Sequence, residues 1–229
     1  MSETVSRFRE IERRVRAAAA HAGRDADVVT LLAVSKTFPA DAVRELYDAG
    51  IRQFGESRVP ELAAKAAALP GDIEWHFIGR LQSNKARRVL QLAAMIHSVD
   101  SPSLLERLER IAAEEDLRRA FLIEVNVSGE ASKAGCSPDG LDALAERAAA
   151  CRFLEWRGLM TMAPAEAAGE SLAAIFRTLR ESRDRLEEKF HRPLPVLSMG
   201  MSGDFECAVA QGSTLVRIGS AIFGGRVYP

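Results

Sequence analysis

From residue 30 onward, short apolar segments alternate with longer amphipathic ones. The short segments are rich in β-branched and aliphatic residues, as is typical of buried strands. Eight are predicted strands: 30–35, 53–55, 75–79, 95–99, 120–127, 154–160, 196–199 and 215–218. The longer segments have apolar residues at helical spacing, and they predict helices over 40–49, 59–68, 84–92, 103–115, 139–151, 169–189 and 204–211. Another helix is predicted over 3–22, before Gly23.

Strands that alternate with helices across short connections indicate a parallel sheet with right-handed crossovers. Eight strands within 229 residues favour a closed (β/α)₈ TIM barrel with an additional N-terminal helix over an open doubly wound sheet. No GxGxxG motif follows the first strand, which weakens a dinucleotide-binding interpretation. The length suits one such barrel, so residues 1–229 are predicted to form a single domain.

Composition narrows the classes of partner. With 47% hydrophobic and 28% charged residues and a net charge of −1, nothing in the bulk electrostatics indicates nucleic acid or an anionic membrane as a partner. No apolar run reaches membrane-spanning length, and the charged N-terminal segment lacks the apolar core of a signal peptide. The three cysteines and four histidines show no metal-ligand spacing. We therefore expect a cytoplasmic protein without a metal site.

Lys36 ends the first predicted strand, in the run LLAVSKT. Active residues of α/β barrels lie at the carboxyl ends of the strands, so this lysine is expected at the barrel mouth. Burial lowers the pKa of a lysine and makes it a neutral nucleophile toward an aldehyde. A surface lysine just beyond the strand is the competing interpretation.

The last two strands end in turns rich in glycine and serine, LSMGMSGDFE and VRIGSAIFGGR. Barrel phosphate sites are built from the loops after strands seven and eight, where small residues let backbone N–H groups approach the anion. The candidate phosphate residues are Ser202, Gly203, Gly219 and Ser220, with Ser198 and Gly200 nearby. The competing interpretation is that these glycines only make tight turns.

Arg217 lies inside the last predicted strand, where an arginine needs a polar partner. Against a pyridine nitrogen it would donate a hydrogen bond and leave that nitrogen unprotonated, which weakens an electron sink. A structural salt bridge is the alternative. Pyridoxal 5′-phosphate (PLP) has three groups that a protein can bind, and the sequence offers a residue set for each. The lysine suits its aldehyde, the glycine- and serine-rich loops suit its phosphate, and the arginine suits its ring nitrogen.

The chain resembles the single-domain PLP-binding proteins of vitamin B6 and amino-acid homeostasis, a family similar to the N-terminal barrel of alanine racemase and to the fold-type III decarboxylases. The motifs that carry the resemblance are AVSKT, FGE, WHFIGRLQSNK, IHSVDS, VNVSGE, GLMTM, LSMGMSGDFE and GSTLVRIGSAIFG. The matches run from about Val34 to Arg226, nearly the whole chain.

The resemblance implies PLP held as a Schiff base on Lys36 and Arg217 facing the pyridine nitrogen. It implies a phosphate held by Ser202, Gly219 and Ser220, and a cofactor lined by Met199, Gly200 and Met201. The chain also departs from the family pattern. Ser57 and Arg58 stand in GESRV where the family often has GENxV, so the Ser57 hydroxyl is expected in place of the asparagine amide. Arg80 stands where the family motif FIGHLQSNK has its histidine, and Ala134 stands where the family often has an aromatic residue.

Three functions remain open. The resemblance favours a PLP carrier without robust turnover, which is expected to be a monomer that meets apo forms of PLP-dependent enzymes transiently. A PLP-dependent amino-acid racemase needs two acid/base groups. Lys36 supplies one, and neither Tyr47 nor Tyr228 ends a predicted strand, so His76 or loop 161–169 would supply the other. We expect His76 and His97 to be interior residues instead. The third function is a Schiff-base aldolase, which would need no ring-facing arginine.

Overall fold

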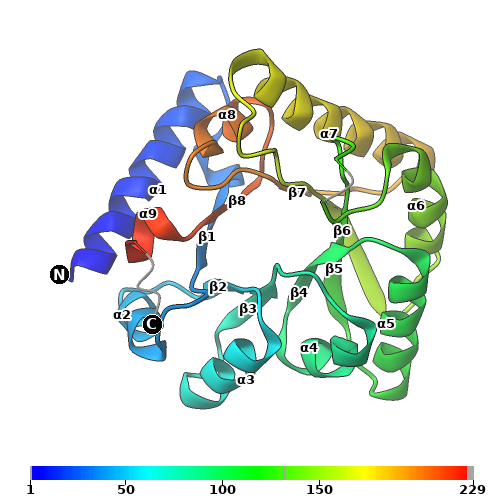
Figure 1. Cartoon of the computed structure of the whole chain (residues 1–229), viewed down its shortest axis with the longest axis horizontal. Helices are drawn as coiled ribbons and strands as arrows, with labels where there is room; N and C mark the ends of the chain where they lie inside the picture. The colour runs from blue at the N-terminus through cyan, green and yellow to red at the C-terminus, as the bar shows by residue number, and fades with distance from the viewer. Residues whose placement is uncertain (1, 131–132, 226–229) are drawn as a thin grey trace.

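Eight parallel strands close into a barrel in which each strand pairs with the next and β8 pairs with β1 (Figure 1). The structure is a computed structural model that describes residues 2–130 and 133–225. The strands are β1 (Thr30–Val34), β2 (Gln53–Glu56), β3 (Glu74–Phe77), β4 (Met95–Val99), β5 (Arg119–Glu124), β6 (Leu154–Met160), β7 (Val196–Ser198) and β8 (Leu215–Ile218). The predicted (β/α)₈ barrel with an additional N-terminal helix is confirmed.

The helices form a ring around the barrel (Figure 1). They are α1 (Glu3–His21), α2 (Ala40–Asp48), α3 (Val59–Ala68), α4 (Ala86–Leu92), α5 (Pro102–Glu114), α6 (Leu141–Ala149), α7 (Gly169–Phe190), α8 (Phe205–Ala210) and α9 (Ser220–Phe223). Short 3₁₀ segments are η1 (Ala26–Val28), η2 (Ser83–Lys85) and η3 (Pro138–Gly140). The patterns did not predict α9 or η1, because a helix of one turn is too short to show a 3.6-residue period.

The predicted fifth strand is too long at its carboxyl end. β5 ends at Glu124, and Val125 forms an isolated bridge with Cys136. Asn126 then organises a turn: its side-chain amide donates to the Glu130 carbonyl at 2.8 Å, and its Oδ1 accepts from the Gly129 N–H at 3.1 Å. An asparagine that hydrogen-bonds the following backbone favours a turn, which overrides the strand preference of its valine neighbours.

Strand alternation divides the apolar side chains into two layers. Outward-facing residues of neighbouring strands pack against one another between the barrel and the helices, as Phe54 of β2 does against Trp75 of β3, with ring centroids 5.9 Å apart. Inward-facing residues fill the barrel. A Cβ added to Gly55 would lie 3.2 Å from the side chains of both Leu32 and Val34, so these three positions face the barrel interior together.

The N-terminal helix α1 covers the outside of the barrel beside α8 and α9 (Figure 1). Its buried stripe includes Phe8, Ile11 and Val15, which recur at helical spacing. Arg14 lies over the Phe205 ring, 4.9 Å from the centroid, and pairs with Glu206 of α8. The helix therefore supports the segment between β7 and β8 from outside.

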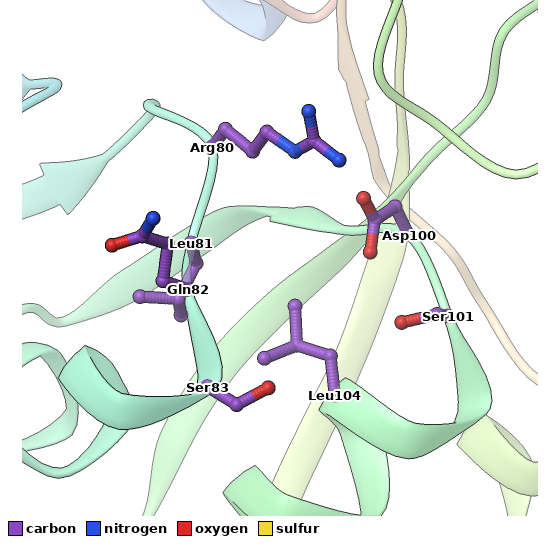
Figure 2. A pocket seen from close by; sticks show the side chains of 7 residues that line it. All are labelled: Arg80, Leu81, Gln82, Ser83, Asp100, Ser101 and Leu104. Atoms are coloured by element: carbon purple, nitrogen blue, oxygen red, sulfur yellow. The ribbon is translucent and has the colours of Figure 1, made fainter.

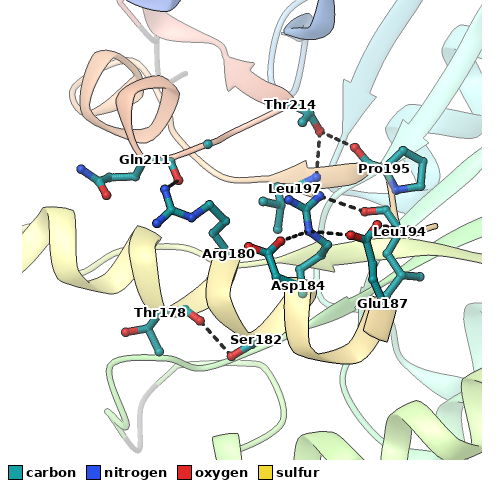
Figure 3. Close-up of polar contacts among 12 residues, drawn as sticks. Thr178, Arg180, Ser182, Asp184, Glu187, Leu194, Pro195, Leu197, Gln211 and Thr214 are labelled. Atoms are coloured by element: carbon teal, nitrogen blue, oxygen red, sulfur yellow. Dashed lines mark hydrogen bonds and ion pairs between the residues drawn. The ribbon is translucent and has the colours of Figure 1, made fainter. Parts of the chain in front are cut away.

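Polar contacts fasten β7 and β8 to α7 at the amino ends of the two strands (Figure 3). The Thr214 hydroxyl accepts from the Leu197 N–H at 2.8 Å and donates to the Pro195 carbonyl at 2.9 Å. Arg183 of α7 donates to the Leu194 carbonyl at 3.2 Å, and Arg180 to the Gln211 carbonyl at 3.2 Å. These contacts fix the strands whose opposite ends carry the candidate phosphate loops.

Candidate functional site

Lys36 follows β1 at the carboxyl end of the barrel, and it is half-buried. Leu32 and Val34 face the interior, so strand alternation puts Lys36 on the interior side of the mouth. The neighbouring Thr37 has a φ of 70°, a left-handed conformation that a β-branched residue rarely adopts. The backbone thus turns sharply just after the lysine, where the run LLAVSKT leaves the strand.

A buried ion pair supports the end of β1 from the helix side. The Ser35 hydroxyl donates to Glu56 Oε1 at 2.6 Å, and Lys65 Nζ contacts Glu56 Oε1 at 2.5 Å and the Ser35 carbonyl at 2.7 Å. Burial raises the pKa of Glu56, and Lys65 and the Ser35 hydroxyl oppose that rise. Glu61 accepts a hydrogen bond from the Thr37 N–H at 2.8 Å. Both backbone neighbours of Lys36 are therefore anchored.

Arg217 projects into the barrel and is 4% exposed. Its guanidinium donates to the Ser198 carbonyl at 2.7 Å, to the Ser198 hydroxyl at 2.6 Å and to the Thr161 carbonyl at 2.9 Å. These acceptors are neutral, so the contacts differ from the salt bridge of the alternative interpretation. Burial lowers the pKa of Arg217 to about 10, which leaves it charged at neutral pH.

Two buried histidines continue this network across the barrel. Nδ1 of His97 lies 2.9 Å from the Ser198 hydroxyl, and Nε2 of His97 lies 2.9 Å from Nδ1 of His76. Burial lowers the pKa of His76 to about 4 and that of His97 well below its ordinary value. Both rings are therefore neutral at pH 7, and the predicted interior role of the two histidines is confirmed.

The loops after β7 and β8 meet through two hydroxyls, with Ser202 Oγ and Ser220 Oγ 3.3 Å apart. Asp204 accepts a hydrogen bond from the Met201 N–H at 2.5 Å, which closes the first loop. Gly200 has a φ of 97°, and a Cβ there would lie 2.7 Å from the Ala208 side chain. Only glycine suits this position, and its carbonyl accepts from the Arg217 N–H at 2.9 Å. The two loops and Arg217 thus form one structural unit.

The sequence profile of the family "Alanine racemase, N-terminal domain" matches residues 7–227. The chain belongs to this family. It is 45% identical over 231 residues to the pyridoxal phosphate homeostasis protein of Pseudomonas aeruginosa, covering 100% of this chain and 98% of that protein. It is 41% identical over 223 residues to the protein of the same name from Aquifex aeolicus, covering 97% and 98%.

Solved structures of family members have the same fold. PipY of Synechococcus elongatus, solved with PLP bound, is 40% identical, with a TM-score of 0.80 that covers 86% of this chain and 93% of that one. The PLP-free form of PipY has a TM-score of 0.83 at 41% identity. The alanine racemase of Streptomyces coelicolor shares the fold at 21% identity, with a TM-score of 0.74 that covers 95% of this chain and 57% of that one.

Most of the family-motif residues singled out in the sequence lie on one side of the barrel mouth, where β7, β8 and β1 are neighbours. Lys36, Met199, Gly200, Met201, Ser202, Arg217, Gly219 and Ser220 come from the ends of β1, β7 and β8. Met199 is buried, whereas Met201 is 36% exposed. Ser57 instead lines a pocket of about 230 Å³ with Arg58, Arg80 and Lys85, between the loops after β2 and β3.

Glu124 is a residue that the sequence reasoning missed. It ends β5 and is 2% exposed, yet its carboxyl group forms no hydrogen bond or ion pair with any residue in 2–130 or 133–225. Burial raises its pKa to about 7, Asp100 adds to the rise, and Arg217 and Arg80 oppose it. The sequence does contain a pattern that points to Glu124, because the apolar run FLIE ends on one ionisable residue, as the run LLAVSK does.

Proposed function

We propose that this protein binds PLP at the carboxyl end of its barrel, with Lys36 as the covalent anchor, and serves PLP homeostasis by holding and delivering the cofactor. One observation carries the proposal: Lys36, Arg217 and the Ser202–Ser220 hydroxyl pair lie at the same end of three adjacent strands, β7, β8 and β1. Relatives that match nearly their full length are named pyridoxal phosphate homeostasis proteins, and one family structure holds PLP.

The residues present suit the group chemically. PLP supplies an aldehyde, a phosphate and a pyridine ring with a basic nitrogen. Lys36 offers a primary amine on the interior side of the mouth. Ser202 and Ser220 offer two hydroxyl donors, and Gly203 carries no side chain, with nothing within 4 Å of where its Cβ would stand. Arg217 offers a donor for the ring nitrogen that stays charged at neutral pH.

The same residues favour retention of the cofactor over turnover. Arg217 stays protonated at neutral pH, so it can donate to a ring nitrogen but cannot supply the proton that makes the ring a strong electron sink. Within the described residues, no tyrosine supports a second acid/base at the mouth. Tyr47 lies on α2 and donates to Asp72 at 2.8 Å, and Tyr228 lies outside the described residues.

Amino-acid racemisation is the second candidate, and Glu124 is the observation that favours it. Its raised pKa, about 7, suits a group that gives and takes protons near neutral pH. It ends β5, across the barrel from β1 and the Lys36 that follows it, so the two groups approach the mouth from opposite sides. If ²H-labelled alanine is recovered after incubation without exchange or inversion, the result would support the carrier. If D-alanine forms in the wild type and Glu124→Gln abolishes its formation, the result would support the racemase.

The proposal includes the cellular compartment, the oligomeric state and the partners of the protein. The protein acts in the cytoplasm as a monomer, and apo forms of PLP-dependent enzymes are its transient partners. Within the described residues, no helix has both the length and the hydropathy to cross a bilayer. The described part of the chain also contains no cluster of metal-ligating side chains.

The test is the visible absorption spectrum of the purified protein before and after PLP is added. The wild type should show the band of lysine-linked PLP, and Lys36→Ala should lack it. Lys189→Ala, which removes an exposed lysine of α7, is the matched control and should keep the band. Borohydride reduction and peptide mass mapping should then find the label on the Lys36 peptide. No band in the wild type with excess PLP would overturn the proposal and favour a Schiff-base aldolase.

A further inference from the structure

A pocket of about 630 Å³ opens between the loops after β3 and β4 (Figure 2). Arg80, Leu81, Gln82 and Ser83 line it from the β3 side, and Asp100, Ser101 and Leu104 line it from the β4 side. It shares none of these residues with the Lys36, Arg217 and Ser202–Ser220 group. Nothing in the function proposed above uses this pocket.

The two charges of the pocket face each other without pairing. In Figure 2 the guanidinium of Arg80 extends across the pocket toward the carboxylate of Asp100. Both residues are described, yet neither forms a hydrogen bond or an ion pair with any residue in 2–130 or 133–225. Charges elsewhere on the protein behave differently: Arg87 pairs with Glu114 at 2.6 Å, and Arg52 pairs with Asp72 at 2.9 Å.

The rest of the lining adds hydroxyls and an apolar wall. The hydroxyl of Ser101 points into the pocket (Figure 2). Ser101 is the N-cap of the 13-residue helix α5, but its side chain makes no capping hydrogen bond. The amino end of that helix adds positive potential on the same wall. Leu104 and Leu81 supply the apolar surface, and the Leu104 side chain points upward into the space.

We propose that this pocket binds a free α-amino acid, with its carboxylate on Arg80 and the amino end of α5, its ammonium on Asp100, and an aliphatic side chain against Leu104 and Leu81. The charges select this class. A phosphate or a simple carboxylate would meet the repulsion of Asp100, and a simple amine would meet that of Arg80. A zwitterion satisfies both groups at once, with charge-assisted hydrogen bonds at each end.

The ligand itself provides the first test, which needs no variant. L-leucine, N-acetyl-L-leucine and L-leucinamide are titrated into the wild-type protein by isothermal calorimetry. Leucine should bind saturably, and loss of either the ammonium or the carboxylate should weaken binding about tenfold or more. Equal binding of N-acetyl-leucine, or displacement of leucine by inorganic phosphate, would overturn the proposal in favour of a plain anion site. So would the lack of saturable heat with leucine and with each of the other common amino acids.

Variants then test whether Arg80 and Asp100 each contribute to leucine binding. Arg80→Ala and Asp100→Asn should each lower leucine affinity about tenfold or more. Arg88→Ala, an exposed arginine on the neighbouring α4, is the matched control and should leave it unchanged. The titrations are repeated on Lys36→Ala, because the site does not depend on PLP. Leucine binding that persists there, whatever the PLP spectrum shows, separates this proposal from the proposed function, whereas binding lost with Lys36 would overturn it.

Discussion

The two sides of the barrel mouth hold their charges in different ways. Around β7, β8 and β1, the buried cations have partners: Arg217 donates to three oxygen atoms, and Lys65 contacts Glu56 and the Ser35 carbonyl. Around β3, β4 and β5, Arg80, Asp100 and Glu124 form no hydrogen bond or ion pair with any described residue. Arg217 and Lys65, on what is called the satisfied side below, are paired within the protein, whereas the three charges on the other, unsatisfied side have no such partner among the described residues.

This difference indicates that one side of the mouth holds a ligand in a fixed place, whereas the other side exchanges ligands or protons. A charge with fixed partners holds its geometry and prepares a site for one ligand in one orientation. A charge without a protein partner is satisfied by solvent, protons or an exchangeable ligand. The β7–β8–β1 side therefore suits a retained cofactor, and the β3–β5 side suits a ligand or proton that comes and goes.

The largest expected effect comes from breaking the satisfied side at Lys65. Lys65→Met leaves Glu56 buried without its cation, which should lower the free energy of unfolding by about 3 to 5 kcal/mol. The loss should grow with pH. Without Lys65 the raised pKa of Glu56 rises further, so the folded state keeps its stability at low pH and loses it as the carboxyl ionises.

Urea unfolding at pH 5 and pH 8 measures this effect. The double variant Glu56→Gln/Lys65→Met should recover part of the stability and lose the pH dependence. Equal stability of Lys65→Met and the wild type at pH 8 would contradict the role of the pair. Arg177→Ala, which breaks only an exposed pair with Glu170, should leave the free energy of unfolding close to that of the wild type at both pH values.

A second break on the satisfied side is Arg217→Met. It leaves the Thr161 carbonyl without its donor inside the barrel and removes one of the two donors to the Ser198 carbonyl, which keeps the Thr161 N–H, so the free energy of unfolding should fall by about 1 to 3 kcal/mol. The measurement is again chemical denaturation. A stable variant with an unchanged near-ultraviolet circular dichroism spectrum would show that the network is dispensable for folding.

On the unsatisfied side, Glu124→Gln should stabilise the protein, in contrast to the two changes above. Burial raises the pKa of Glu124 from 4.5 to about 7, so in the wild type its contribution is present below pH 4.5 and lost as pH rises through 7. The variant has no such loss and should be more stable above pH 7 by at most about 3 kcal/mol.

Thermal and urea unfolding from pH 4 to pH 9 measure this gain. Below pH 4.5 the variant and the wild type should coincide. Glu188→Gln, which changes an exposed glutamate of α7, serves as the control and should follow the wild type throughout. A destabilised Glu124→Gln at pH 8 would mean that the carboxylate has a partner there.

The smallest expected effect concerns the candidate phosphate loops. Ser220→Ala removes one hydroxyl of the Ser202–Ser220 pair and should weaken PLP binding about tenfold, the worth of one hydrogen bond to a charged group. Fluorescence titration with PLP gives the dissociation constant. Ser171→Ala, an exposed serine of α7, should leave it unchanged. An unchanged constant for Ser220→Ala would separate this hydroxyl from the phosphate.

Local patterns predicted most of the fold. Alternation and helical period located all eight strands and the longer helices, because burial of one face imposes those periods on the sequence itself. The errors fall where local chemistry competes, as at Asn126, whose turn ends β5 early. Lys36 and Arg217 stood out because a charged residue in or at the end of an apolar strand is costly unless it has a role.

The sequence by itself determined the order of the elements, the closed barrel and the strand ends that carry the candidate site. Only the tertiary structure decided which groups satisfy one another. His97 and Ser198 are 101 residues apart and meet through barrel closure, and Glu56 finds Lys65 only after α3 folds back onto β2. Periodicity is a local property of the chain, whereas the pairing of buried charges depends on distances that exist only once the barrel has closed.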